Sequence, residues 1–106
     1  MLNQVVLVGR LTEEVEFIEE NKIAYVVLSV PRAFKNSDGE YETDFVRAEL
    51  PNTIATNTKE YCHKGDIIGL KGRLQGVVSE EDGNKKYSLE LVADKVTFLS
   101  SKASNE

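Results

Sequence analysis

Hydrophobic and polar residues alternate along residues 66–78 and predict a long strand with two unlike faces. One face of this strand carries the apolar positions Ile68, Leu70, Leu74 and Val78. The other face carries Ile67, Lys71, Arg73, Gln75 and Val77. Three glycines interrupt the run, at Gly69, Gly72 and Gly76. Because glycine inside a strand usually marks a bend or a close backbone approach, we expect this strand to serve two regions of a small closed barrel. A long edge strand of a β-sandwich is the alternative.

The first half of the chain contains three more predicted strands. Residues 3–11 are apolar on both faces, which predicts cover by the core on one side and by a second sheet or a second subunit on the other. An acidic connection over 12–22 follows, for which a short hairpin around residues 19–22 is one arrangement. Residues 23–30 are rich in β-branched and aromatic side chains, and Pro31 restricts that point to a sheet edge or a strand end. Residues 43–50 alternate cleanly, with Val46, Ala48 and Leu50 inward.

The remaining segments complete the pattern. Asp38-Gly39 predicts the turn of a hairpin over 31–42. Asn52 is expected to cap a short helix that runs to about residue 63, with Ile54, Thr58, Tyr61 and Cys62 on one side, and Gly65 to end it in a left-handed conformation. A turn over 79–84 leads to a last strand, 85–99, in which Tyr87, Leu89 and Leu91 share a face. A bulge near Ala93-Asp94 would let Val96 and Phe98 continue the core pattern.

The predicted fold is therefore all-β: a five-stranded barrel with one short helix between strands 3 and 4, the arrangement of the OB fold. Residues 1–99 form the domain, and the polar tail 100–106 is expected to be disordered. The 106 residues suffice for one domain, and 41% hydrophobic and 29% charged residues are typical of a soluble protein. The sequence has a single cysteine, and it has neither an apolar run long enough to span a membrane nor a leader pattern. These features favour a cytoplasmic protein.

The distribution of charge matters more than its sum. The formal net charge of −5 argues against a polyanionic partner for the molecule as a whole. Several basic residues nevertheless lie close to aromatic residues that are expected to point outward. Phe45 lies beside Arg47 on one predicted strand, and Phe34 lies in a basic hairpin. Rings that stack on bases, next to cations that pair with phosphates, suit single-stranded nucleic acid. The candidate DNA-binding residues are Arg32, Phe34, Lys35, Phe45, Arg47, Lys71, Arg73, Lys85 and Lys86. The alternative is that the two phenylalanines pack into a second core layer or an interface.

Catalytic and metal sites have little support in the sequence. Cys62-His63 supplies two ligands where a structural zinc site needs about four, and neighbours on a helix point in different directions, which does not suit a nucleophile and its base. A buried thiol and a solvent-facing histidine are expected instead. No paired carboxylates, phosphate-binding glycine loop or catalytic triad is present, so we predict no enzyme activity, no metal and no cofactor.

Several segments in collinear order resemble bacterial single-stranded DNA-binding proteins. They are Asn3 to Leu11, Gly39-Glu40 to Thr43-Asp44-Phe45, Lys64-Gly65-Asp66, Gly72 to Gln75 and Val92 to Val96. The resemblance implies an OB-fold homotetramer, assembled partly through residues 3–11, that wraps single-stranded DNA in replication, recombination and repair, in association with the nucleoid. It also implies base stacking on Phe34 and Phe45, and a basic groove that contains Arg47 and Arg73.

The sequence departs from the family pattern at three places. Pro51 and Val78-Ser79 stand where aromatic residues are usual, which predicts weaker binding or a shorter site. Residues 100–106 contain no acidic, Phe-tipped peptide, so either the sequence is one domain of a longer protein or recruitment of other proteins through such a tail is not expected. A protein-interaction module of the same fold, with weakened DNA affinity, and an RNA-binding protein remain alternative functions.

Overall fold

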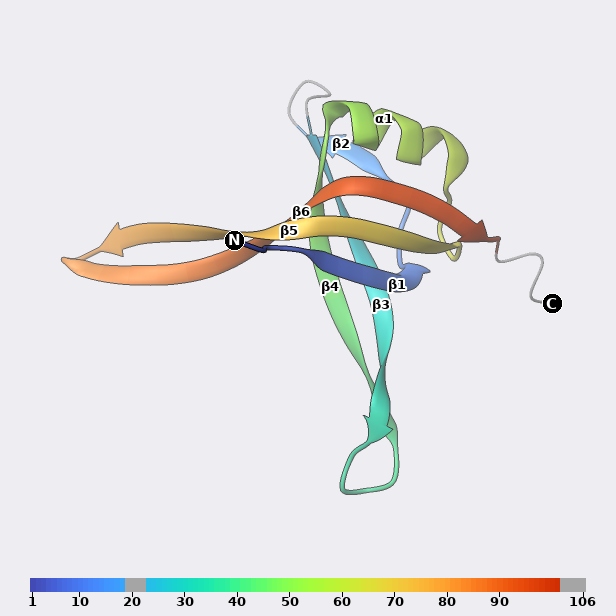
Figure 1. Cartoon of the computed structure of the whole chain (residues 1–106), viewed down its shortest axis with the longest axis horizontal. Coiled ribbons are helices and arrows are strands. Elements are labelled where there is room, and N and C mark those ends of the chain that lie inside the picture. Colours follow the sequence, from blue (N-terminus) through green and yellow to red (C-terminus); the bar gives the residue numbers. More distant parts are fainter. Residues whose placement is uncertain (19–22, 102–106) are drawn as a thin grey trace.

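The computed structural model describes residues 1–18 and 23–101. Its elements, in chain order, are β1 (Val5–Leu11), β2 (Glu16–Ile18), β3 (Ile23–Lys35), β4 (Tyr41–Pro51), α1 (Asn52–Tyr61), β5 (Ile67–Glu81) and β6 (Asn84–Ser100) (Figure 1). The predicted strands and helix are all present, and β2 is an additional short strand paired with β3. The hairpin turn expected at 19–22 and most of the expected disordered tail (102–106) lie outside the described residues.

Five strands close into a barrel. The strand order is β1-β5-β6-β4-β3-β2, and β1 also pairs with β3, which joins the two ends of the five-stranded part. Closure occurs where Arg10 pairs with Ser29 and Leu11 with Leu28. The long strand β5 pairs with β1 on one side and with β6 on the other, as its length and glycines predict. The prediction of an OB-type barrel with a helix before its fourth strand is confirmed, and the sandwich alternative is excluded.

The core lies inside this barrel, and α1 covers one end of it. The largest almost fully buried side chains come from β1, the connection after it, β3, β4 and β5: Leu11, Val15, Leu28, Leu50, Ile68 and Leu70. The helix contributes Ala55 and Thr58, and Cys62 follows directly after it. The predicted inward positions Ala48 and Leu50 are buried, which fixes the outward face of β4 as the face that carries Phe45 and Arg47.

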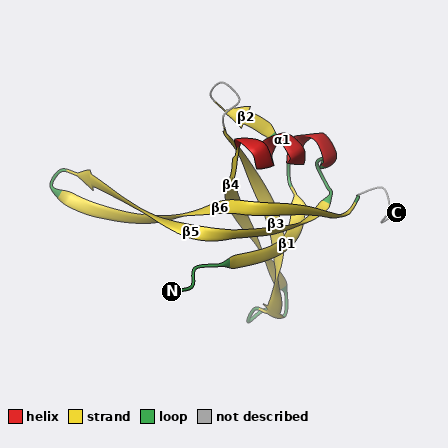
Figure 2. Ribbon diagram, turned by 45° about the horizontal axis from the view of Figure 1, so that its top comes forward, coloured by secondary structure: helices red, strands yellow, loops and turns green. Residues whose placement is uncertain are grey.

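Two hairpin arms extend from the barrel in different directions (Figures 1 and 2). The β3–β4 arm ends in the turn around Gly39, whose φ is +78°. The β5–β6 arm ends in Asp82-Gly83, where both residues have positive φ, as a two-residue hairpin turn requires. The core pattern predicted for β5 and β6 does not hold along this arm. Leu74, Val78, Tyr87 and Leu89 are 41–73% exposed because the strands have left the barrel there.

Gly72 marks the point where the β5–β6 arm begins to diverge from the barrel. A Cβ atom on Gly72 would lie 2.2 Å from the carbonyl oxygen of Val92, so only glycine fits. The register shifts at this point, from Lys71 paired with Lys95 to Gly72 paired with Ala93. Asp94 is therefore the extra residue of a bulge, as predicted for Ala93-Asp94. Gly69 and Gly76 have no such close contact, so the glycines of the strand have different roles.

Several local predictions need correction. β3 continues through Pro31 to Lys35, because β4 is its only neighbour there among residues 1–18 and 23–101 and the missing N–H faces an open edge. Pro51, not Asn52, is the N-cap of α1, and it makes no side-chain capping bond. The helix ends at Tyr61, which is 65% exposed. Gly65 does have positive φ, but it lies in the turn after the helix. Phe98 is 46% exposed and does not belong to the core.

Candidate nucleic-acid interface

The outer face of β3 and β4 carries the exposed ring of Phe45 and, next to it, an arginine whose side chain packs on a tyrosine ring. Phe45 is 69% exposed, and Arg47 follows it two residues later on the same face of β4. The guanidinium of Arg47 lies over the ring of Tyr25 on β3, 4.0 Å from the ring centroid. The hydroxyl of Tyr25 donates to Oε1 of Glu49 at 3.4 Å. Tyr25 therefore positions Arg47 while leaving the Phe45 ring open to solvent.

A groove runs between this face and the β5–β6 arm. It has a volume of about 300 Å³ and is lined by Tyr25, Arg47, Glu49, Ser88, Leu89, Glu90 and Leu91; we call it the arm groove. The arm groove opens at the end of the short parallel pairing between β4 and β6. In that pairing Ala48 lies opposite Leu91, and Glu49 lies opposite Val92. One cation and two carboxylates line the arm groove. A neutral base with apolar faces therefore suits its interior better than a phosphate does.

Arg32 lies on the opposite face of the β3–β4 arm. Its guanidinium donates to Asp44 at 2.9 and 3.1 Å and to Glu42 at 2.5 Å, and both acids alternate with the outward residues of β4. The hydrogen bond from Arg32 lowers the pKa of Asp44, and the same bond raises the pKa of Arg32. Arg32 is thus neutralised by two acids on the face away from Phe45.

Phe34 and Lys35 lie near the end of the same arm. Phe34 is 85% exposed, and it lies where the β3–β4 register shifts between Pro31 and Lys35. The Nζ atom of Lys35 is 5.7 Å from the centroid of the Tyr41 ring. In this chain Phe34 and Phe45 are both open to solvent, and neither belongs to the barrel core.

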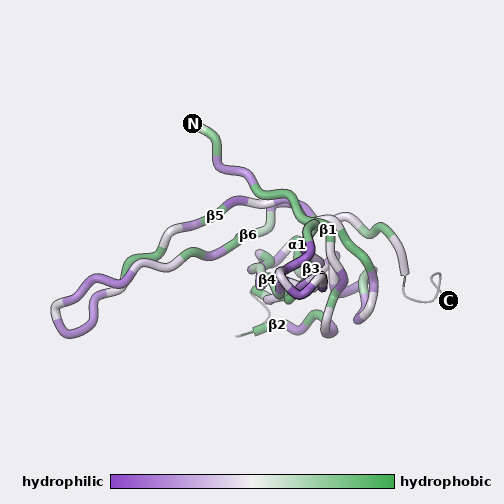
Figure 3. Tube along the Cα trace, turned by 90° about the horizontal axis from the view of Figure 1, so that it is seen from below, coloured by the Kyte–Doolittle hydropathy of each residue, from purple (hydrophilic) through white to green (hydrophobic). Residues whose placement is uncertain are grey.

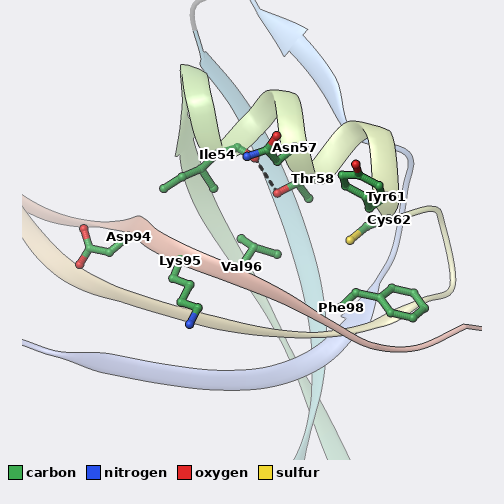
Figure 4. Close-up of a pocket in the computed structure, with 9 residues that line it drawn as sticks. All are labelled: Ile54, Asn57, Thr58, Tyr61, Cys62, Asp94, Lys95, Val96 and Phe98. Atoms are coloured by element: carbon green, nitrogen blue, oxygen red, sulfur yellow. Dashed lines mark hydrogen bonds between the residues drawn. The ribbon is translucent and has the colours of Figure 1, made fainter.

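Lys71 and Arg73 do not join Arg47 in the arm groove. Lys71 lines a different depression, together with Val6, Val8 and Lys95. Arg73 donates to Oδ1 of Asp94 at 2.8 Å, and Asp94 lines a pocket under α1 (Figure 4). The structure therefore separates the basic residues that the sequence groups into one trough.

The two lysines of the β5–β6 arm lie on opposite faces. Val78 pairs with Tyr87 and Glu80 with Lys85, so Lys85 shares the face of Tyr87. Lys86 pairs with Ser79 on the other face. Tyr87 is 73% exposed and stands directly across from Val78, one of the positions where the sequence lacks an expected aromatic residue. Sequence reasoning assigned Tyr87 to the core face and did not consider Tyr25.

The residues Cys62 and His63 have ordinary structural roles. Cys62 is buried, and its burial raises the pKa of the thiol. The exposed ring of His63 lies 3.2 Å from Oε1 of Glu14. The pKa of Glu14 is lowered, mainly because its carboxylate accepts the backbone N–H of Lys64. In residues 1–18 and 23–101, no group of three or more His, Cys, Asp or Glu side chains could hold a metal ion. No helix among those residues is long and apolar enough to cross a bilayer.

Comparison with known proteins identifies the family. The model of the single-strand binding protein family matches residues 2–99. The chain is 42% identical to single-stranded DNA-binding protein B of Bacillus subtilis, over 96% of this chain and 94% of that protein. It is 39% identical to a single-stranded DNA-binding protein of Staphylococcus aureus, over 100% of this chain and 70% of that protein.

Solved structures agree on the fold. A small single-stranded DNA-binding protein from Streptomyces coelicolor superposes with a TM-score of 0.65 and 19% identity, covering 92% of this chain and 95% of that one. The Plasmodium falciparum SSB in complex with ssDNA gives a TM-score of 0.72 and 19% identity, over 94% and 96% of the two chains. From the family match and the identities to its relatives, the chain belongs to the single-strand binding protein family.

Proposed function

We propose that this protein binds single-stranded DNA without strong sequence preference, by stacking bases on exposed rings and pairing phosphates with basic side chains. The observation that carries the proposal is the exposed ring of Phe45 beside Arg47, at a groove between two arms of an OB-type barrel. Family membership and the printed names of the relatives support the same ligand. Stacking tolerates any base because every base has a π-face, so weak sequence preference follows.

Within the cell we propose a role in protecting exposed DNA strands during replication, recombination and repair, by a domain that spans residues 1–99. No step of this function uses a cofactor or a covalent reaction. A protein-interaction module of the same fold is the second candidate. The observation that favours it is the neutralisation of Arg32 and Arg73 by acids, in a chain whose formal net charge is −5.

A titration of labelled oligo-dT across a range of salt concentrations tests the proposal. Binding that weakens linearly with the logarithm of the salt concentration is expected, together with much weaker binding to duplex DNA. Failure to bind oligo-dT at low salt by a folded, assembled protein would contradict the proposal and favour the protein-interaction module. Stronger binding to oligo-U than to oligo-dT would indicate an RNA ligand instead.

Arg47 and Arg32 provide a matched pair of variants for that titration. Arg47→Ala is expected to weaken binding roughly threefold to tenfold and to reduce the salt slope by about 1, because it removes a positive charge from the lining of the arm groove. Arg32→Ala is expected to change the affinity less than about twofold, since its charge is already paired with Asp44 and Glu42. Equal losses of affinity in Arg47→Ala and Arg32→Ala would contradict the expectation that DNA binds one face of the β3–β4 arm and not the other.

We further propose that the protein self-associates through β1, in a homotetramer. Val6 and Val8 point outward from β1 and are 66% and 54% exposed, although both are apolar. Among the described residues, β1 pairs with β3 only at Arg10 and Leu11, so the edge of residues 5–8 that faces away from β5 has no neighbouring strand there. An exposed apolar face beside an open edge is the form of surface that a second copy covers.

Light scattering after size exclusion tests this assembly. The wild-type protein is expected to elute with the mass of four chains. Val8→Glu is expected to yield smaller species, because a carboxylate would be buried without a partner in the interface. The matched control is Val78→Glu, at a position that is 58% exposed on the β5–β6 arm, and it should leave the mass unchanged. A monomeric wild-type protein would contradict the proposed role of β1.

A further inference from the structure

Two lysines lie opposite each other across β5 and β6, on the outer side of the barrel. Lys71 pairs with Lys95, and Val6 of β1 pairs with Lys71 in the same row. Paired residues lie on one face of a sheet with their Cβ atoms about 5 Å apart. Figure 4 shows Lys95 pointing away from α1, while Val96 of the same strand points toward it. The two cations therefore share the outward face with Val6.

No acid of the described chain neutralises this lysine pair. Among residues 1–18 and 23–101, no carboxylate forms a salt bridge with Lys71 or Lys95. Asp94 precedes Lys95 in the sequence, but its carboxylate accepts from Arg73 at 2.8 Å. Like charges directly opposite each other in a sheet are destabilising, so a lysine pair without a counter-charge needs an explanation.

The lysine pair borders a depression in the outward face. Gly69 has no side chain to fill the space between Val8 and Thr97, its partners on the two neighbouring strands. Pockets for drug-sized ligands have volumes of roughly 300 Å³ or more, so a smaller depression suits a small ion. This one has a volume of about 160 Å³, and we call it the lysine depression; it is lined by Val6, Leu7, Val8, Gly69, Leu70, Lys71, Lys95 and Thr97.

The lysine depression lies on the surface proposed above for self-association. Figure 3 shows β1 as a hydrophobic stretch, coloured green, after the hydrophilic residues near the N-terminus. A second copy related by a two-fold axis presents the same residues, and the lining of the depression contains no acid. Contact through this face would take both lysines out of water without a counter-charge, which is costly. A bound anion would supply the missing counter-charge.

We propose that the lysine depression binds a small multivalent oxyanion, such as inorganic phosphate, which bridges Lys71 and Lys95 and stabilises the contact between copies of the chain. The proposal rests on the self-association through β1 proposed above and adds a ligand that regulates it. The anion neutralises the lysine pair at the moment when the interface removes it from water. Because the anion then occupies both lysines, a carboxylate introduced by Val8→Glu still finds no free cation in the interface.

A dilution series followed by light scattering tests the site, with sodium chloride and sodium phosphate compared at equal ionic strength. In phosphate the wild-type protein is expected to stay assembled at lower protein concentrations than in chloride. At a phosphate concentration about ten times the dissociation constant, each occupied site should strengthen assembly roughly tenfold by mass action. Sulfate should act as phosphate does, because it has the same shape and also carries more than one charge.

The decisive variant is the double substitution Lys71→Gln, Lys95→Gln. It should assemble in chloride at least as well as the wild-type protein, because the repulsion between the lysines is gone. Its response to phosphate should fall to the general effect of salts that are excluded from protein surfaces. The matched control is Lys86→Gln, which removes an exposed lysine of the β5–β6 arm and should assemble as the wild-type protein does in both salts.

The outcomes separate this site from the proposed assembly. An equal response to phosphate in the wild-type protein and the double variant would overturn the site, since it would reflect only the general effect of salt. A wild-type tetramer whose assembly is the same in both salts and that binds no phosphate would also overturn the site, and it would leave self-association through β1 standing. A monomer in both salts would overturn both proposals.

Isothermal titration calorimetry with inorganic phosphate gives a second readout, which does not depend on dissociation of the assembly. Saturable binding is expected for the wild-type protein and for Lys86→Gln, and none for the double variant. The phosphate groups of DNA offer the same chemistry, so oligo-dT binding is measured as well, and the double variant should bind within about twofold of wild type. A large loss of oligo-dT binding, with no calorimetric binding of inorganic phosphate to the wild-type protein, would overturn the proposal and assign the lysines to DNA.

Discussion

A Phe45→Ala variant is expected to bind oligo-dT roughly 10- to 100-fold more weakly than the wild-type protein, the effect of losing one stacked base. Phe45 is 69% exposed, lies next to the Arg47–Tyr25 pair and contributes nothing to the barrel core. Its removal should therefore leave the fold and the assembly unchanged. The salt slope should also be unchanged, because the ring contacts a base and releases no counterions. Anisotropy titrations at several salt concentrations measure both quantities.

The control for Phe45→Ala is Tyr61→Ala. Tyr61 is similarly exposed, at 65%, but it lies on α1 beside a pocket lined by the helix and β6 (Figure 4). Tyr61→Ala should bind oligo-dT as the wild-type protein does. Equal binding by wild type and Phe45→Ala would place the bases elsewhere on the molecule and would remove the main support for the proposed interface.

Gly72→Ala is expected to destabilise the protein by about 3 kcal/mol, at the upper end of the range for overpacking, because the added methyl overlaps backbone that cannot rotate away. The contacts it would meet are the carbonyl oxygen of Val92 at 2.2 Å, the carbonyl carbon of Val92 at 3.0 Å and Cα of Ala93 at 3.1 Å. These atoms belong to the bulge that redirects β6 toward the arm. Chemical denaturation at a fixed protein concentration measures the change in the free energy of unfolding.

Gly76→Ala, four residues along the same strand, is the matched control. Its methyl meets nothing within 4 Å, so the free energy of unfolding should stay within about 0.5 kcal/mol of wild type or rise slightly. Similar losses at the two positions would mean that glycine is needed along the whole strand for backbone freedom. The close approach at Val92 would then not be the cause.

The closed barrel could be predicted because its signals are local and agree with one another. Alternation places Ala48, Leu50, Ile68 and Leu70 inward, and all four are buried. The phase change at Ala93-Asp94 marks a bulge that is present. The same alternation failed at Tyr87 and Leu89, since a pattern of apolar positions does not show where a strand leaves the barrel.

The candidate site was harder to predict, because it depends on which distant strands come together. Arg47 and Arg73 have similar positions on their strands, yet one lies over Tyr25 and the other is held by Asp94. No sequence pattern shows that the bulge at Asp94 would supply a carboxylate to Arg73. Tyr87 could have been found: counting outward from the two-residue turn at Asp82-Gly83 places it opposite Val78.

The most direct test of the account is to locate bound DNA on the wild-type protein by aromatic NMR shifts during titration with oligo-dT. The account predicts large shifts for the rings of Phe34, Phe45 and Tyr87, which belong to the two arms, and none for Tyr61 and Phe98 beside α1. Shifts confined to Tyr61 and Phe98, with the rings on the arms unchanged at saturation, would contradict it.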